Sequence, residues 1–357
     1  MHLMKSSIQT DSKSSIFFRY LSISVLFGAL IILLIHKIYD FDIWWHLKAG
    51  QYIVQNNRIP NHDIFSYTAS NRPWTDLHWL FQILVYRIWI LWGAWGLIVM
   101  KSVVLISTFT LLFKVGYRKE WHIVSIISVF LAVLVASERF VERPEIFTFL
   151  FTVTYLLLLH QYKYEGSKLV WLLPFLQIVW TNTQGLFIIG PGLIFAYGLG
   201  EYATSKIPIL RNWRVESTME VKRLRVLLNI LLLTSLACLL NPYGYKGALF
   251  PLVLFTRIGD SANLYAQTVI EFRRPFGIYP IPFSIYFYKV LLVGSLLSFA
   301  LNVKRIDLSQ FLVYIAFLYL SVLARRNIAL FAFVATPAMV CNVNTFLDSQ
   351  RGASVVK

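Results

Sequence analysis

The sequence is built from long apolar runs that are separated by shorter polar segments. An α-helix needs about 20 mostly apolar residues to cross a hydrocarbon core of about 30 Å. Uninterrupted runs of this kind are not typical of β-barrel strands, which alternate over shorter segments. With 57% hydrophobic residues, the chain is predicted to be an all-α polytopic membrane protein of about ten transmembrane helices, in a range of 9 to 11, at 17–35, 94–113, 121–137, 146–160, 169–183, 185–200, 226–240, 284–301, 308–323 and 327–342.

The segment 78–93 is also apolar, but it is short and contains Arg87. This pattern favours a surface or re-entrant helix over a full crossing. We therefore predict one membrane domain, 17–342, in which 36–93 forms a first outer loop with juxtamembrane helices. The segments 1–16 and 343–357 are predicted to be cytoplasmic tails.

Lysine and arginine concentrate in the segments that this topology places inside, as the positive-inside rule requires. The inner loops 114–120, 161–168 and 302–307 are short and basic, and the longer inner segment 201–225 is a polar connector. The formal net charge of +16 is explained by this topology and by anionic lipid on the inner face. It does not require a nucleic-acid partner.

Polar motifs gather at the outer ends of the predicted spans, so we place the functional face outside. They are DFDIWWHL (40–47), FVERPEIF (140–147), WTNTQGLF (180–187), LNPYGYKG (240–247), EFRRPF (271–276) and LARRNIAL (323–330).

These motifs, with WWHLKAGQYI, IPNHDIFSYT and RPWTDLHWLF in the first outer loop, resemble those of bacterial polytopic proteins related to the GT-C glycosyltransferases. The order RPE, WTNTQG, NPYG and RRN is also similar, and the resemblance covers nearly the whole chain. It implies a GT-C-like fold in the bacterial inner membrane, with the active face periplasmic or extracellular.

GT-C enzymes, such as the aminoarabinose and protein O-mannosyl transferases, take a sugar from a polyprenyl phosphate and carry an acidic motif in the first outer loop. The resemblance therefore implies transfer of a hexose or pentose, with inversion, to an envelope lipid, glycan or protein. The better-known enzymes have more spans or an added soluble domain, so the acceptor stays open.

Glycosyl transfer to a hydroxyl needs a carboxylate that takes the acceptor proton. Asp40 or Asp42 is the candidate general base, because the pair lies in the first outer loop. The structural alternative is that Asp42 caps the helix beginning near Ile43.

A polyprenyl-phosphate leaving group needs cations, and guanidinium groups match phosphate oxygens with two parallel hydrogen bonds. Outer arginines are the candidates, although each could instead extend to lipid headgroups. Those assigned to substrate binding are Arg143, Arg273, Arg325 and Arg326.

Other candidate substrate contacts have structural alternatives. Trp44, Trp45 and His46 could stack on or bond to a sugar, or could belong to an interfacial aromatic belt. Glu145 could support the site or simply pair with Arg143. The remaining candidates contact sugar hydroxyls or satisfy helix-turn carbonyls: Asn182, Gln184 and Asn241.

His46, His62 and His78 lie sixteen residues apart, and with Asp63 and Asp76 they could in principle hold a metal. The spacing matches no zinc signature. A divalent cation, Mg²⁺ or Mn²⁺, bound by Asp40 and Asp42 stays open as a cofactor.

Two other functions remain. The Gly190-Pro191-Gly192 break raises a transporter or lipid-linked glycan flippase, although ionisable residues within the spans are few, mainly Lys101 and Lys289. A non-catalytic GT-C-like scaffold in envelope glycan assembly would tolerate loss of Asp40 and Asp42.

Overall fold

A computed structural model describes residues 13–68, 70, 72–207, 221–259, 268–277 and 282–355. Two predicted features fall partly outside these residues: the tails, at 1–12 and 356–357, and the inner connector, at 208–220.

Within the described residues the chain forms twelve α-helices, and its only β pairing there is an isolated bridge between His62 and Pro73. The predicted all-α fold class is therefore confirmed. The helices are α1 (Lys13–Leu34), α2 (Asp42–Asn56), α3 (Trp79–Lys114), α4 (His122–Ala136), α5 (Glu145–Glu165), α6 (Leu173–Thr183), α7 (Ile189–Lys206), α9 (Val221–Ala237), α10 (Tyr245–Gly259), α12 (Phe283–Leu301), α13 (Leu308–Leu323) and α14 (Ile328–Val355).

Each predicted span overlaps one of these helices, and α2 and α10 are additional. Five helical segments in the described part are both long and apolar enough to cross a membrane: 16–34, 79–114, 119–139, 283–301 and 325–351. Several such segments in one chain define a multi-pass integral membrane protein.

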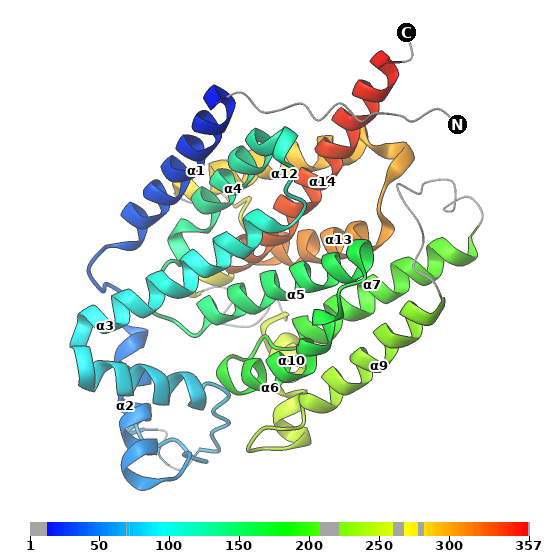
Figure 1. Cartoon of the computed structure of the whole chain (residues 1–357). Helices are drawn as coiled ribbons and strands as arrows, with labels where there is room; N and C mark the ends of the chain where they lie inside the picture. Colours follow the sequence, from blue (N-terminus) through cyan, green and yellow to red (C-terminus); the bar gives the residue numbers. More distant parts are fainter. Residues whose placement is uncertain are drawn as a thin grey trace.

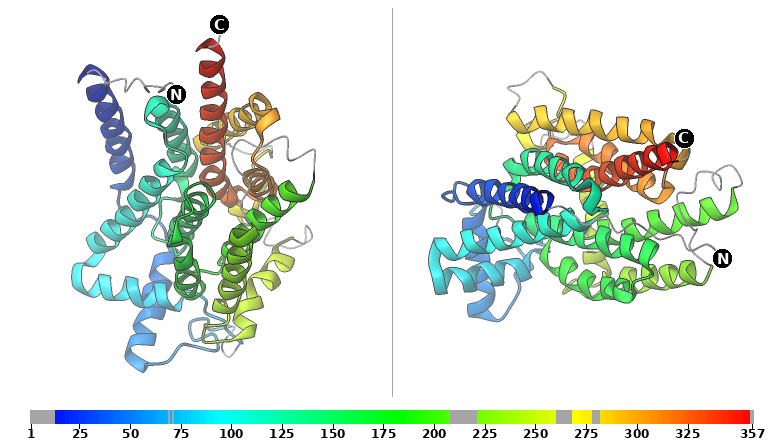
Figure 2. Two further views of the ribbon diagram at one scale, coloured as in Figure 1. Left: turned by 45° about the vertical axis from the view of Figure 1, so that its right-hand side comes forward. Right: turned by 45° about the horizontal axis from the view of Figure 1, so that its top comes forward.

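The centre of the bundle is α14, which packs against α12, α4 and α13 (Figure 1). Around it, α5 packs on α3 and α7 packs on both α13 and α9. The start of α1 and the end of α14 lie at one end of the molecule, and α2 lies at the other (Figures 1 and 2). We call the end that carries α2 the α2 end.

A kink divides α3 into two limbs at Gly93, where φ is 58° and ψ is −147°. Only glycine adopts this conformation without strain. The first limb packs against α2, and the second enters the bundle. The segment predicted as a surface helix, 78–93, is thus the first limb of α3.

One ion pair is fully buried in the bundle. The Nζ atom of Lys101 lies 2.9 Å from Oε1 of Glu142, and both side chains are 0% exposed. The same ammonium donates to Nε2 of His36, 3.1 Å away. Lys101 therefore neutralises the carboxylate of Glu142, which lies shortly before the start of α5.

Removing one charge of this pair is expected to leave the other buried without compensation, at a cost of about 3–5 kcal/mol. Lys101→Met should lower the melting temperature in detergent, and Lys101→Met/Glu142→Leu should recover much of the loss. Lys289→Met is the matched control, because Lys289 is a partly exposed lysine stacked on Tyr286. A double variant no more stable than Lys101→Met would contradict the pairing.

Candidate active site

An ion-pair network at the α2 end is centred on Arg143, in the turn before α5. Its Nε and Nη2 atoms lie 2.5 Å and 2.8 Å from the two carboxylate oxygens of Asp40. Its Nη1 atom lies 2.8 Å from Glu271, and Nη2 lies 2.9 Å from Oδ2 of Asp42. One guanidinium thus joins three segments that are far apart in the sequence.

A second arginine, Arg139, extends the network. It pairs with Glu145, and its Nη1 lies 3.0 Å from Glu271. The alternative pairing of Arg143 with Glu145, expected from their closeness in sequence, is wrong: Arg139 takes Glu145, and Arg143 turns toward Asp40. The backbone at the start of α5 directs the side chains of Glu145 and Arg143 toward different neighbours.

The segment before α14 joins the same end. The Nη2 atom of Arg325 lies 2.6 Å from Glu138, and its backbone N–H donates to the carbonyl of Arg273, 2.8 Å away. The guanidinium of Arg326 lies 5.2 Å from the centre of the Phe272 ring. The structure therefore brings together the predicted motifs DFD, ERPE, EFRR and RRN.

The two aspartates of the first loop differ in environment. Asp40 is 9% exposed and both its oxygens are held by Arg143. The Asp42 side chain is 48% exposed. Its pKa is raised by partial burial, opposed by the charge of Arg143 and reinforced by that of Asp40. Asp42 is thus the carboxylate that an external molecule can reach.

The capping alternative for Asp42 is wrong by one position. Helix α2 starts at Asp42 itself, and Phe41 occupies the N-cap position without a side-chain cap. Asp40 instead accepts the backbone N–H of Asp42 at 3.4 Å.

Beside the network lies an aromatic cluster formed by α2 and the segment before α3. The rings of Trp45 and His46 are 3.7 Å apart between centroids, and those of His46 and His78 are 5.7 Å apart. Burial, with the charges of His78 and Arg143, lowers the pKa of His46 well below its ordinary value. His46 is therefore neutral at pH 7. The neighbouring Trp44 is 48% exposed.

Asp76 lies in the same region and is 1% exposed. Its Oδ1 accepts from the backbone N–H of His78 and from Nε2 of Gln82, and its Oδ2 has no hydrogen-bond partner in the described structure. Burial raises its pKa to about 6, against the effect of these two hydrogen bonds. The site therefore holds, in Asp76, a buried carboxyl group whose pKa lies about two units above its ordinary value.

The amide candidates make their hydrogen bonds within the protein. Asn182 accepts from Nε1 of Trp79, 2.9 Å away, and donates to two backbone carbonyls. Gln184 accepts from Thr148 at 2.9 Å, and Asn241 closes the turn that follows α9. These three residues connect the first loop to α6 and to the turn after α9.

The residues at this end do not fit a metal site. Both oxygens of Asp40 bind Arg143. His46 and His78 lie together, whereas His62 bonds to its neighbour Asn61 at 2.8 Å. Across the described residues, no group of three or more His, Cys, Asp or Glu side chains is arranged to hold a metal ion.

Neither a family model nor a curated protein sequence matches the chain. Solved structures do. The archaeal oligosaccharyltransferase AglB from Archaeoglobus fulgidus, in complex with an inhibitory peptide and a dolichol-phosphate, matches with a TM-score of 0.60 and 13% identity over 95% of this chain and 52% of that one. The apo form of the Archaeoglobus fulgidus oligosaccharyltransferase matches with a TM-score of 0.56 and 15% identity over 95% and 52%.

A third structure, of the same oligosaccharyltransferase tethered to an acceptor peptide containing the NVT sequon, gives a TM-score of 0.57 and 14% identity over 96% and 51%. The chain thus spans about half the length of these proteins. At such low identity the likeness concerns the fold alone. The chain has a GT-C-like membrane fold, as its sequence motifs predicted.

Sequence reasoning gave no role to Glu271, counted Arg139 only among the outer arginines, and named Asp76 only as a possible metal ligand. Arg139 and Glu271 lie at outer helix ends, which was their one signal, but their partners are distant in sequence. Asp76 stood out only as one of several possible metal ligands. Its unpaired oxygen and raised pKa depend on burial, which the sequence does not encode locally.

Close approach of α2 to α3 positions His46 over His78, and Gly50 permits it. A Cβ atom on Gly50 would lie 2.1 Å from the backbone oxygen of Gln82. Gly50→Ala should therefore displace α2 and lower the melting temperature by several degrees. Gly28→Ala is the matched control, since nothing lies within 4 Å of a Cβ there. Equal melting temperatures for the two variants would contradict this packing.

The pKa of Asp76 predicts a pH dependence. Because its folded pKa of about 6 exceeds the ordinary 3.8, the folded state holds a proton that the unfolded chain has lost in this window. Its contribution to stability is therefore present below the window and falls as pH rises through it. Asp76→Asn should match the wild type near pH 4 and become the more stable protein by several degrees at pH 7.

Asp63→Asn supplies a control of opposite sign. Hydrogen bonds from Ser66 and Phe65 lower the pKa of Asp63, so its stabilisation is present above the ordinary pKa and lost as pH falls. That variant should melt below the wild type at pH 7, and the difference should shrink in acid. Parallel melting curves for Asp76→Asn and the wild type across pH 4–7 would refute the assignment for Asp76.

Proposed function

We propose that this chain is a GT-C-type glycosyltransferase that moves a sugar from a polyprenyl-phosphate donor to a hydroxyl of an envelope lipid, glycan or protein. The observation that carries the proposal is Asp42, an accessible carboxylate of raised pKa beside Arg143, at one end of a GT-C-like fold. Binding of a dolichol-phosphate by AglB supports the class of donor. The membrane is a bacterial inner membrane, and the α2 end faces outward.

Asp42 is the general base in this proposal. It accepts the proton of the acceptor hydroxyl as the acceptor oxygen bonds to the anomeric carbon from the face opposite the phosphate. The bond between the anomeric carbon and the phosphate oxygen breaks, and polyprenyl phosphate leaves with the electron pair. A raised pKa suits this role, because a base works best when its pKa approaches the working pH.

Arg326 binds the departing phosphate. Within the described structure its guanidinium has no carboxylate in an ion pair; it rests on the Phe272 ring. The pKa of His78 is lowered chiefly by burial and, to a smaller extent, by the charge of Arg326. Arg326 therefore lies close to His78. Within the described part of the chain, the charge of Arg326 is therefore free of a direct carboxylate partner and can bind an anionic ligand.

The other site residues divide into two groups. The exposed Trp44 stacks on the sugar, and the neutral His46 with Trp45 forms the adjoining wall. Asp40 is a positioning residue that holds Arg143 against Asp42. The remaining residues predicted to bind substrate maintain this frame through their internal hydrogen bonds and ion pairs: Glu145, Asn182, Gln184, Asn241, Arg273 and Arg325.

One observation favours a non-catalytic scaffold as the second candidate. Several of the charges at this end neutralise one another, including Asp40 with Arg143 and Arg139 with Glu145. A scaffold would keep this network for stability alone. The flippase alternative gains no support from Lys101, which is fully buried against Glu142.

The two candidates differ in their response to Asp42→Asn. In the enzyme, this variant should fold normally and lose about 10²–10⁴-fold of its transfer rate, which is the usual contribution of a general base. The assay follows transfer from radiolabelled polyprenyl-phosphate sugars in membranes with matched protein levels. Glu120→Gln, an exposed acid at the opposite end, is the control and should leave the rate unchanged.

Asp40→Asn separates positioning from catalysis. It should lower both the melting temperature and the transfer rate, because it leaves Arg143 partly unpaired. A transfer rate in Asp42→Asn equal to that of the wild type would refute the assignment of Asp42 as the general base. Absence of transfer in the wild type with a broad donor panel would favour the scaffold.

A further inference from the structure

A buried lysine inside the bundle contacts both of the chain segments that meet at the candidate active site. Lys101 lies on the second limb of α3, and its side chain is 0% exposed. Its Nζ atom lies 2.9 Å from Oε1 of Glu142 and 3.1 Å from Nε2 of His36. His36 follows α1 and Glu142 precedes α5, so one ammonium joins two segments that are far apart in the sequence.

Each partner of Lys101 is close in sequence to one member of the ion pair between Arg143 and Asp40. Glu142 directly precedes Arg143, and His36 stands four residues before Asp40. The carboxylate of Asp40 lies 2.5 Å from Nε of Arg143. The same two segments are thus joined by Lys101 inside the bundle and by Arg143 at its edge.

The imidazole of His36 is held on both ring nitrogens. Since Nε2 accepts from the ammonium of Lys101, the ring proton lies on Nδ1, which donates to the carbonyl of Lys37, 3.0 Å away. The carbonyl oxygen of Phe140 lies 3.1 Å from Nε2, and the buried Phe140 ring packs edge-on against Phe109 of α3. The start of the first loop therefore rests directly on the segment that leads to α5.

Stability alone does not require a charge at this position. Apolar side chains of similar volume often stabilise a protein as well as a buried ion pair does, because burying charges is costly. A charge supplies direction, which apolar contact does not. The hydrogen bond and ion pair of Lys101 fix His36 and Glu142 in one relative position.

We propose that Lys101 is a positioning residue that fixes the first loop against the turn before α5, and so holds Arg143 against Asp42. Lys101 is buried and touches no substrate. Its effect reaches Asp42 through Arg143, whose Nη2 lies 2.9 Å from Oδ2 of that residue. The consequence for catalysis rests on the proposed glycosyl transfer, whereas the position of the loop does not.

Distances between two spin labels test the position of the loop without an assay of transfer. The labels are attached to cysteines that replace Lys37, exposed in the first loop, and Ile123, 48% exposed at the start of α4. The full-length protein carries alanine in place of its native Cys238 and Cys341, so that only these two positions are labelled.

His36→Ala should broaden the distribution of label distances, because it frees the loop from Lys101. His36→Gln should narrow the distribution again, since the amide oxygen can accept from the same ammonium. His36 is only partly buried, so neither substitution is expected to prevent folding. Lys101→Met/Glu142→Leu removes both contacts of the ammonium and should broaden the distribution as His36→Ala does.

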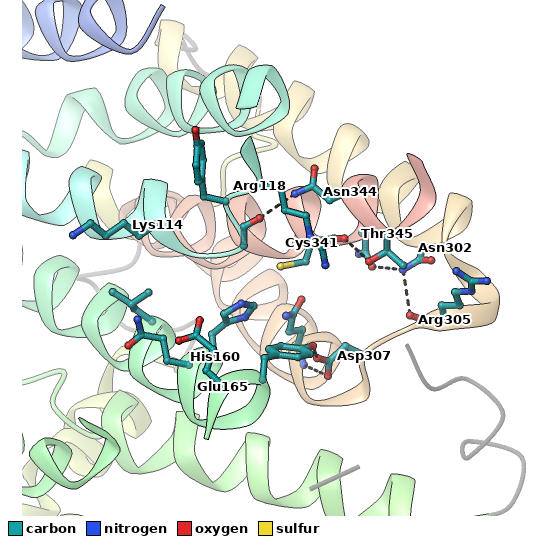
Figure 3. Close-up of a pocket in the computed structure, with 17 residues that line it drawn as sticks. Lys114, Arg118, His160, Glu165, Asn302, Arg305, Asp307, Cys341, Asn344 and Thr345 are labelled. Atoms are coloured by element: carbon teal, nitrogen blue, oxygen red, sulfur yellow. Dashed lines mark hydrogen bonds between the residues drawn. The ribbon is translucent and has the colours of Figure 1, made fainter. Parts of the chain in front are cut away.

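Asn344→Ala is the control for a general loss of hydrogen bonds between helices. Nδ2 of Asn344 donates to the carbonyl of Gly116, just beyond the end of α3, at 3.0 Å. Figure 3 shows Asn344 at a cavity of about 210 Å³, also lined by Asn342, at the end of the molecule opposite α2. This variant should leave the label distances unchanged. Unchanged distances in His36→Ala, or equal broadening in Asn344→Ala, would overturn the proposal.

The transfer assay tests the consequence at Asp42. In Lys101→Met/Glu142→Leu, kcat should fall about ten- to a hundred-fold with little change in KM, the scale of a misplacement of about 1 Å. The acidic limb of the pH–rate profile should move to higher pH. The reason is that the charge of Arg143 lowers the pKa of Asp42, and displacing Arg143 removes this effect.

The two measurements separate failure of this proposal from failure of the proposed function. A double variant that transfers at the wild-type rate, with the same pH profile, would refute the positioning role. If the wild type transfers no sugar from any donor, the proposed function fails and the label distances decide alone. Broadening in His36→Ala then supports the position assigned to the loop, and an unchanged distribution refutes it.

Discussion

The arrangement of the α2 end depends on the pairing of Arg143 with Asp40. Charges at the edge of an apolar bundle are costly unless they are paired and hydrogen-bonded. Arg143 meets this requirement with Asp40, Asp42 and Glu271, which approach it from different parts of the chain. The pairing therefore fixes where the first loop, the start of α5 and the segment before α12 lie relative to one another.

This network also gives two neighbouring aspartates different properties. Asp40 is held on both oxygens, whereas Asp42 touches the edge of the same guanidinium and stays accessible. The close approach of α2 to α3 at Gly50 then sets the aromatic wall beside Asp42. A rigid support around one accessible group is what precise chemistry requires.

The two ends of the bundle carry polar groups of different kinds. At the α2 end, ion pairs satisfy most of the charged groups, and Asp42 stays accessible although it pairs with Arg143. At the opposite end, the buried side chains of Asn342 and Asn344 are each fixed by a hydrogen bond, to Asn302 and to the carbonyl of Gly116. Between them the bundle is largely apolar, and its buried Lys101 is matched by Glu142.

Periodicity and composition were sufficient to predict an all-α membrane bundle, because helices of this length are the means by which a chain satisfies its backbone in lipid. The order of the polar motifs was sufficient to predict a GT-C-like fold and to gather the site at one end. The ion-pair partners were not predictable, because they join residues that are far apart in sequence. Arg143, for example, pairs with Asp40 and not with Glu145. The burial of Asp76, the exposure of Asp42 and the cavity beside Asn342 likewise arise from packing between helices, which local sequence does not encode.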